Sequence, residues 1–372
     1  MEKRLLIVRK YGGFGGIEHQ IETITSGLIA QGWQVYFLSD RKSPLSDSLA
    51  GRGAHVTWIP FGGFLKTAKA IRNLCRENQI SIIQSHMLKE SFYCRLAKLL
   101  MPSLHHVFRV HTYIDCSHIS SMKKRCYHLA GFISDFLVDR YVSINEDNVR
   151  EMRVRTHISG RKIVVAHDAV RYLEPQDQAC PYKNGHIAMI ANFVDFKGHD
   201  VLLEGLKILR DLGHPVVAHL IGGVPGQGTA NEDRRRLDIV EQTIRADGLE
   251  DLIAMDGYQE NMAKAISQCG MVVLPSDSEG TPNVLLEGML LNKIVVASSV
   301  GGVPEFVIEG ETGFLHPPQD AQAFAQALMR AYNTPDDKLD EIASRAYALV
   351  QREYSAGQVV RQLIEVYKGF AE

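Results

Sequence analysis

Several features of other protein classes are missing from this sequence of 372 residues. No apolar run reaches the roughly 18–20 residues that a membrane-spanning helix needs, so any membrane contact should be peripheral. The six cysteines form no C-x-x-C pair and no zinc-site spacing, which favours reduced thiols in a cytoplasmic protein. The apolar run at residues 5–8 is too short for a signal peptide. A net charge of −2 gives no basic excess, which argues against nucleic acid as a partner.

What the sequence does contain is a regular alternation of short apolar runs and amphipathic stretches. This alternation is typical of parallel sheets covered by helices on both faces. The apolar runs predict strands at residues 5–8, 35–38, 56–59, 82–83, 107–110, 142–144 and 163–165, and then at 187–190, 216–221, 252–255, 271–274 and 294–297. Helices are expected between most of these runs, for example at 17–31, where Gly32 would end the helix. The fold class is therefore α/β, with two Rossmann-like, doubly wound domains.

A stretch without apolar periodicity, residues 171–185, separates the two sets of strands and contains two prolines. We interpret it as the linker between an N-terminal domain, residues 1–172, and a C-terminal domain, residues 173–354. The last helix, residues 355–372, is expected to cross back to the N-terminal domain. Ligands of such domains bind at the carboxyl ends of the strands, so a cleft between the two domains is the expected site.

The segment from Ser276 to Gly288 offers the clearest site. Leu274 ends a predicted strand, Thr281 is a candidate helix cap and Pro282 a preferred first helical residue. The free N–H groups at such a helix start, with the helix dipole, suit a diphosphate. The candidate residues for binding a sugar diphosphate are Gly280, Thr281, Asn283, Val284 and Glu287, and Glu279 is the candidate to accept hydrogen bonds from sugar hydroxyls. The alternative is an ordinary helix start with two solvated glutamates.

Glu279-Gly-Thr-Pro-Asn-Val-Leu-Leu-Glu287, with Pro275-Ser276 before it and Val300-Gly-Gly-Val-Pro-Glu-Phe-Val after it, resembles the E-x7-E motif of retaining glycosyltransferases of family 4. The resemblance implies the GT-B fold, with two Rossmann-like domains facing a central cleft. It also implies that Glu279 binds hydroxyls of the donor sugar, that Glu287 binds the ribose, and that transfer retains the anomeric configuration without a metal.

Other loops are similar to elements of the same family. Lys197 lies in a segment like the family's Arg-x-x-x-x-Lys-Gly element and would neutralise the donor diphosphate, but Asn192 stands where arginine is usual. The Gly-Gly-x-Glu loop at Gly15, Gly16 and Glu18 resembles the loop between donor phosphate and acceptor. Three further candidates are Gly222, Gly223 and His86, of which the glycines would pass near the diphosphate and His86 would touch the acceptor.

His111 resembles the family's strand-end histidine, which lines the sugar site. The candidate catalytic residues are therefore Glu279, Lys197 and His111. Each of these loops also has a purely structural interpretation: a solvated lysine, a flexible turn or a core histidine. Asn145 and Glu146 follow another strand and are weaker candidates. The basic and aromatic stretch at 121–137 is either an amphipathic helix packed on the sheet or a membrane-facing patch.

The resemblance implies a hexosyltransferase that moves a sugar from a nucleotide sugar to a glycan or lipid-linked acceptor in bacterial polysaccharide or lipopolysaccharide synthesis. UDP is favoured over GDP as the nucleotide, and no cofactor or metal is expected. The expected location is the cytoplasm, including the inner face of the membrane. The alternatives are an epimerase or phosphorylase of the same fold, or a non-catalytic subunit that binds a sugar nucleotide.

Overall fold

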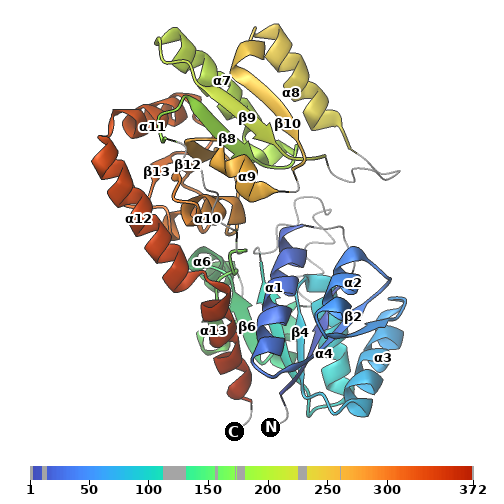
Figure 1. Cartoon of the computed structure of the whole chain (residues 1–372). Helices are drawn as coiled ribbons and strands as arrows, with labels where there is room; N and C mark the ends of the chain where they lie inside the picture. The colour runs from blue at the N-terminus through green and yellow to red at the C-terminus, as the bar shows by residue number, and fades with distance from the viewer. Residues whose placement is uncertain are drawn as a thin grey trace. The chain divides into compact units, whose positions relative to one another are not determined.

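The computed structural model describes residues 3–10, 15–111, 131–155, 158–171, 173, 181–224, 233–259 and 261–370. The chain divides into two compact units (Figure 1). Unit 1 comprises Met1–Ala169 together with Ser355–Glu372, and unit 2 comprises Val170–Tyr354. The division thus falls between Ala169 and Val170, shortly before the position expected from the sequence. The last helix belongs to unit 1. Most of the expected linker lies outside the described residues.

Unit 1 is built on a sheet in which all strand pairs are parallel, in the order β3-β2-β1-β4-β5-β6-β7. The neighbours of β1 are β2 on one side and β4 on the other, so the topological switch point lies beside β1. The strands are β1 (Arg4–Val8), β2 (Gln34–Ser39), β3 (His55–Trp58), β4 (Ile82–Ser85), β5 (His105–Val110), β6 (Arg140–Ser143) and β7 (Ile163–Val165).

Helices cover both faces of this sheet, as the all-parallel pairing requires. They are α1 (Gly16–Ala30), α2 (Pro44–Gly51), α3 (Phe64–Glu77), α4 (Leu88–Leu100), α6 (Glu146–Arg155) and α13 (Ala356–Lys368), with short 3-10 turns η1 (Asp135–Leu137) and η2 (Gly160–Lys162). Successive residues of a strand face opposite ways, so Ile82 packs in the core beneath α1 and α13 while Ile83 packs in the core beneath α3 and α4.

Helix α13 is an integral part of unit 1 rather than a loose tail. Figure 1 shows it in red beside the blue α1, and the two helices are in contact. Gly27 permits this approach, because a Cβ at Gly27 would lie 2.5 Å from Val360 Cγ2. Tyr367 is fully buried and its ring centroid lies 5.3 Å from that of Trp33. The end of the chain therefore completes a core begun by its first strand.

Unit 2 has a second all-parallel sheet, in the order β10-β9-β8-β11-β12-β13, with its switch point between β8 and β11. The strands are β8 (His186–Ile190), β9 (Val217–Ile221), β10 (Ile253–Gly257), β11 (Met271–Leu274), β12 (Ile294–Ser298) and β13 (Phe314–His316). The helices are α7 (His199–Asp211), α8 (Arg235–Ala246), α9 (Met262–Ser267), α10 (Asn283–Leu290), α11 (Ala321–Asn333) and α12 (Asp336–Glu353), with 3-10 turns η3 (Asp195–Lys197), η4 (Glu250–Leu252) and η5 (Val303–Glu305).

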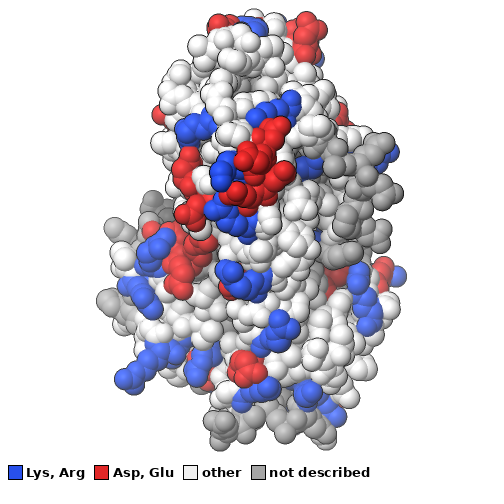
Figure 2. Space-filling model, turned by 60° about the vertical axis from the view of Figure 1, so that its left-hand side comes forward, with Lys and Arg blue, Asp and Glu red and all other residues white. Residues whose placement is uncertain are grey.

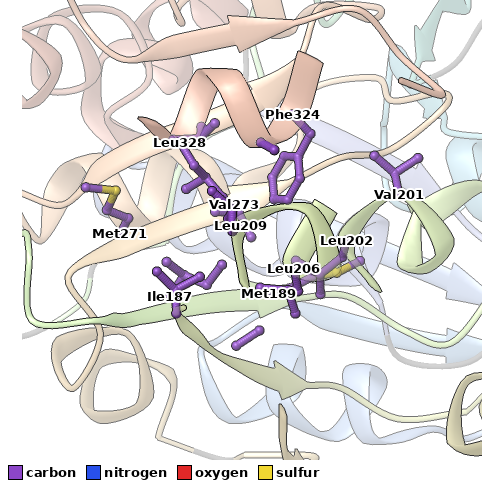
Figure 3. Close-up of a cluster of buried hydrophobic side chains, with 14 of the residues drawn as sticks. Ile187, Met189, Val201, Leu202, Leu206, Leu209, Met271, Val273, Phe324 and Leu328 are labelled. Carbon is purple, nitrogen blue, oxygen red and sulfur yellow. The ribbon is translucent and has the colours of Figure 1, made fainter. Parts of the chain in front are cut away.

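One core of unit 2 joins α7 and α11 to the sheet. Figure 3 shows Phe324 of α11 beside Val201 and Leu202 of α7, over Met189 of β8. Gly205 allows this packing, since a Cβ there would lie 2.4 Å from Phe324 Cδ1. A second core lies under α10 and α12 and includes residues of β11 and β12. These two cores hold β8, β11 and β12 in place, and the loops that follow β8 and β11 carry residues of the candidate site.

The predicted strands are all present, within about two residues at their ends, and the fold class is confirmed. One strand was not predicted: β13, which is only three residues long. Two details of the predicted helix at Pro282 are wrong. Pro282 is the cap with extended backbone rather than the first helical residue, and Thr281 lies before the cap.

Candidate functional site

The side chains of Lys197 and Glu279 form an ion pair in unit 2, with Lys197 Nζ 2.7 Å from Glu279 Oε1. Lys197 ends η3, which follows β8, and Glu279 lies between β11 and α10. Because β8 and β11 are neighbours in a parallel sheet, their following loops meet at the same edge, at the switch point. The Glu279 side chain is 8% exposed and that of Lys197 is 21% exposed. A cation and an anion therefore lie together at the place where this fold class binds ligands.

Close backbone contacts hold the two loops together. Asp277 N donates to Phe196 O at 2.8 Å. Gly198 has a φ of +76°, and a Cβ at this position would lie 1.8 Å from Pro275 O. Only glycine fits there. Gly301 is similar, since its Cβ would lie 1.8 Å from Glu279 O. The position of Glu279 is thus set by backbone packing on two sides.

The α10 helix begins at Asn283, with Val284 in its first turn, and its cap residue is Pro282, whose side chain cannot accept a hydrogen bond. Glu287 lies further along α10 and is buried, with its Oε1 3.3 Å from Arg171 Nη2. Burial raises the pKa of Glu287 to about 7, although Arg171 acts in the opposite direction. The second glutamate of the motif is therefore held in a largely dehydrated place, with one cation as its partner.

The loops after β8 and β9 also lie against each other. Phe193 N donates to Gly223 O at 2.9 Å, and Gly223 N donates to Asn192 Oδ1 at 3.4 Å. A Cβ at Gly222 would lie 1.9 Å from Ala191 O, so this position also requires glycine. Asn192 thus joins two loops of the site edge. A direct contact of Asn192 or of either glycine with a diphosphate remains a prediction.

In unit 1, His86 and His111 lie together at the ends of the neighbouring strands β4 and β5. His86 Nδ1 is 2.9 Å from His111 Nε2, and His111 Nδ1 is 3.4 Å from Asp168 Oδ2. Arg109 Nη2 donates to Asp168 Oδ1 at 2.9 Å. Both ring nitrogens of His111 therefore have protein partners. Burial lowers the pKa of His86, and His111, Arg109 and Arg9 lower it further.

The glycine loop at the start of α1, with Gly15, Gly16 and Glu18, includes part of a charged cluster that Glu18 forms with Arg9 and Glu90. Glu18 is 4% exposed, and its Oε1 accepts from Arg9 Nη2 at 2.8 Å. Glu90 binds the same arginine at 3.2 Å. Gly15 is the cap residue of α1 and Gly16 its first helical residue. The Glu18 carboxylate is thus paired with Arg9 in this structure. The Gly-Gly-x-Glu pattern in the sequence did not predict this ion pair.

The stretch predicted at 121–137 is described only from residue 131 onward. Within it, Phe132, Ile133 and Phe136 are exposed by 58%, 62% and 67%. Among the described residues there is no helix long and apolar enough to span a membrane. The described parts of the chain also contain no group of three His, Cys, Asp or Glu residues arranged to hold a metal ion.

The surface that includes α12 mixes charges of both signs. On the face drawn in Figure 2, acidic and basic side chains lie close together. Along α12, Glu341 pairs with Lys338 at 2.9 Å and with Arg345 at 3.4 Å. Such exposed pairs along a helix contribute little to stability.

Sequence comparisons assign both halves of the chain. Residues 14–172 match the family described as Glycosyltransferase Family 4, and residues 184–334 match the family described as Glycosyl transferases group 1. The chain belongs to the group 1 glycosyltransferases of family 4. Together the two matched ranges include every candidate site residue named above.

Relatives of this chain include the amylovoran biosynthesis glycosyltransferase AmsK of Erwinia amylovora. AmsK is 30% identical over 194 residues, which is 50% of this chain and 45% of the relative. The putative colanic acid biosynthesis glycosyltransferase WcaL of Escherichia coli strain K12 is 27% identical over 204 residues, 53% of this chain and 48% of the relative. The matches thus span about half the length of these curated relatives.

Solved structures show the same GT-B fold. A glycosyltransferase from Rickettsia africae has a TM-score of 0.83 at 18% identity, covering 100% of this chain and 99% of its own. Anabaena HepE, solved in complex with UDP and glucose, has a TM-score of 0.81 at 18% identity, covering 99% and 100%. The two Rossmann-like units are therefore those of a GT-B protein.

The amino-acid sequence alone did not identify some residues of the site. Arg171, the partner of Glu287, was placed in the linker, and Asp168, the partner of His111, was not considered. No spacing rule connects these residues, because Asp168 and His111 are brought together only by the pairing of β5, β6 and β7. Gly198 did carry a signal, since glycine directly after a predicted turn often marks a left-handed backbone.

Proposed function

We propose that this chain is a retaining glycosyltransferase that moves a hexose-type sugar from a nucleotide sugar to a glycan or lipid-linked acceptor. The observation that carries the proposal is the Lys197–Glu279 pair at the switch point of unit 2. The names of the relatives, which refer to amylovoran and colanic acid biosynthesis, favour bacterial surface polysaccharide or lipopolysaccharide assembly as the pathway. A structural neighbour, the lipopolysaccharide outer core galactosyltransferase WaaB, supports the same assignment.

In this proposal the donor diphosphate lies against Lys197 and the start of α10. The ammonium group and the helix dipole would stabilise the negative charge that grows on the leaving diphosphate. Glu279 would then exchange its bond to Lys197 for hydrogen bonds from hydroxyls of the donor sugar. Glu287 would bind the ribose diol, since two carboxylate oxygens match two hydroxyls.

The chemistry proposed for the reacting carbon is a front-face substitution with retention. The transition state would resemble an oxocarbenium ion, as in other glycosyl chemistry. The leaving phosphate would accept the proton of the acceptor hydroxyl, so that no side chain acts as nucleophile. The rate enhancement would then come from positioning and from the fixed charges of Lys197 and α10.

UDP is the nucleotide we propose, bound without a metal. The support is indirect: Anabaena HepE, of the same fold, was solved with UDP-glucose. Thermal unfolding of the full chain with UDP, GDP or ADP, each with and without EDTA, tests both points. A stabilisation by UDP that persists in EDTA is expected, whereas a preference for GDP or a loss of stabilisation in EDTA would contradict this part of the proposal.

Product analysis tests the activity itself. The full chain would be incubated with UDP-glucose and other UDP-sugars, with and without a membrane extract that supplies acceptors. Transfer requires that UDP is released together with a new glycoside of the same anomeric configuration as the donor. An epimerised donor, release of a sugar phosphate, or nucleotide binding without turnover would instead identify an epimerase, a phosphorylase or a non-catalytic subunit.

The proposal places the chain in the cytoplasm, at the inner face of the membrane. Phe132, Ile133 and Phe136 support the membrane contact, because three large apolar side chains within five residues are exposed. Such a surface would bring the enzyme to a lipid-linked acceptor without a spanning helix.

A further inference from the structure

A chain of buried polar side chains runs through unit 1 from helix α13 to His111. Tyr367 Oη donates to Gln84 Oε1 at 2.6 Å, and Gln84 Nε2 lies 3.0 Å from His86 Nε2. His86 Nδ1 is 2.9 Å from His111 Nε2, and His111 Nδ1 is 3.4 Å from Asp168 Oδ2. Tyr367 and Gln84 are completely buried and His86 is 1% exposed. Bulk water therefore does not compete for these hydrogen bonds.

The carboxylate of Asp168 determines which atom donates and which accepts in each of these hydrogen bonds. Burial alone would raise the pKa of Asp168, but hydrogen bonds from His111 and from the buried Arg109 guanidinium, 2.9 Å away, hold it below its usual value, so the group is ionised. An ionised carboxylate only accepts hydrogen bonds, and His111 Nδ1 must therefore carry the hydrogen. In a neutral imidazole the other nitrogen then accepts. His111 Nε2 accordingly accepts from His86 Nδ1.

The same logic continues to the tyrosine. Because His86 Nδ1 donates, His86 Nε2 accepts, and its partner is the amide group of Gln84. The Gln84 carbonyl oxygen is then free to accept from the Tyr367 hydroxyl, as the 2.6 Å distance indicates. Each of these four hydrogen bonds then has one donor and one acceptor, and both histidines are neutral with hydrogen on Nδ1.

Protonation of either histidine to an imidazolium ion disrupts this arrangement. Protonated His86 would present an N–H to the Gln84 amide, so that Gln84 would have to turn over. The Tyr367 hydroxyl would then face the Gln84 NH₂ group, and its hydrogen would lose the acceptor that Gln84 Oε1 provides. A buried donor without an acceptor is unfavourable. This hydrogen-bond network thus disfavours a further proton on the ring of His86.

We propose that Tyr367, Gln84 and His86 are positioning residues that hold His111 as a neutral ring with hydrogen on Nδ1 and in a single orientation. This inference rests on the proposed function, together with the sugar-site role that the family resemblance implies for His111. A positive charge develops on that sugar in an oxocarbenium-like transition state. A neutral ring backed by Asp168 avoids the repulsion that an imidazolium ion would create.

Nuclear magnetic resonance of the full chain labelled with ¹⁵N-histidine tests the hydrogen-bond chain without any donor. Long-range ¹H–¹⁵N correlation separates the two neutral tautomers from the imidazolium ion, and spectra of His86→Gln and His111→Gln identify the two rings. Both rings are expected to be neutral with hydrogen on Nδ1 near pH 7. Hydrogen on Nε2 of His111 would overturn the proposal.

Two variants separate positioning from simple packing. Tyr367→Phe removes the hydroxyl that opposes turning of Gln84, so the protonation midpoint of the histidine pair should rise by about one pH unit. Gln84→Glu places an acceptor beside His86 Nε2, and His86 should become an imidazolium ion near pH 7. The control is Tyr93→Phe, which changes a buried tyrosine on the other face of the sheet and should leave both rings unaltered.

Transfer rates as a function of pH complete the test. The acidic limb of kcat should move up by about one pH unit in Tyr367→Phe, and Tyr93→Phe should keep the native profile. An unchanged limb alongside a shifted histidine midpoint would refute the positioning role. Absence of transfer by the native chain would refute the proposed function and, with it, this role in the reaction, while the magnetic resonance result would still decide the tautomers.

Discussion

Lys197 and Glu279 lie 82 positions apart in the sequence and yet are each other's partner in the structure. A pair of this kind holds its own charges in place before any ligand is present. The sequence predicted that both residues lie at the carboxyl edge of the sheet, because each follows an apolar strand. It did not predict their contact, which depends on β8 and β11 being neighbours in the sheet.

Replacement of either partner should therefore abolish most of the activity. Lys197→Ala and Glu279→Ala are each expected to lower kcat/KM by about 10²–10³, since a charge aimed at the transition state is lost. The double variant should fall by less than the product of the two single losses, because the residues act together. Steady-state kinetics of the four proteins measures this.

The matched control is Lys207→Ala. Lys207 also pairs with a glutamate, Glu204, at 2.8 Å, but on an exposed face of α7. Its kcat/KM should stay within about twofold of the native value. Near-native turnover by Glu279→Ala would show that this motif is not the donor site.

Glu287 should make the stability of the protein depend on pH. The folded carboxyl group has a pKa of about 7 and the unfolded group one near 4.5, so the folded state binds more protons between these values. The free energy of unfolding should consequently fall as pH rises through this range, by about 2.5 kcal/mol between pH 5 and pH 8.

The variant Glu287→Gln removes this contribution. Relative to the native chain, its free energy of unfolding in urea should rise by about 2.5 kcal/mol from pH 5 to pH 8. Glu241→Gln, at a partly exposed glutamate paired with Arg245 on α8, should show a constant difference. A constant difference for Glu287→Gln as well would mean that Arg171 keeps Glu287 ionised throughout.

The loops of the site depend on glycines as much as on charged groups. Gly198 begins α7 with a left-handed backbone directly against Pro275 O, and Gly222 approaches Ala191 O as closely. These contacts fix the distance between neighbouring strand-to-helix loops. A substitution in them disturbs the site through the backbone.

Gly198→Ala should destabilise the protein by at least about 3 kcal/mol, because a left-handed alanine is strained and its Cβ meets a backbone oxygen that cannot move away. Gly248→Ala separates the two causes, since Gly248 has a φ of +60° with no atom within 4 Å of its Cβ. It should cost only about 1–2 kcal/mol. Urea unfolding measures both, and equal losses would exclude the backbone contact as a cause.

Elements were predicted well where they are long or strongly apolar. The run Met271–Leu274 is fully buried, and its uniform apolar character alone defined β11. Strand β13 escaped prediction because three residues carry no measurable period, and only pairing with β12 makes it a strand. The start of α10 was misplaced by one residue, because Thr281 has favourable cap chemistry and Pro282 favours the first helical position, whereas in the structure Pro282 is itself the cap.

For the whole molecule, the clearest expectation concerns membrane contact. The double variant Phe132→Ser/Phe136→Ser should bind phosphatidylglycerol vesicles about tenfold more weakly or worse. It lacks the two apolar side chains whose transfer from water into the bilayer would favour binding. Cosedimentation of the full chain with the vesicles measures this. The control is Leu212→Ser, which alters an exposed apolar side chain of unit 2. Equal loss in both variants, or no binding by the native chain, would contradict the proposed contact.

The return of α13 to unit 1 has a consequence for the order in which the protein can form during synthesis. Unit 2 is one continuous stretch, and its two ends are joined by a hydrogen bond from Val170 N to Tyr354 O at 2.8 Å. Unit 1 is discontinuous, because Val359, Leu363 and Tyr367 belong to its core. During synthesis the ribosome therefore completes all of unit 2 before it synthesises α13. Until α13 has emerged, the part of the unit 1 core that α13 covers stays exposed to solvent.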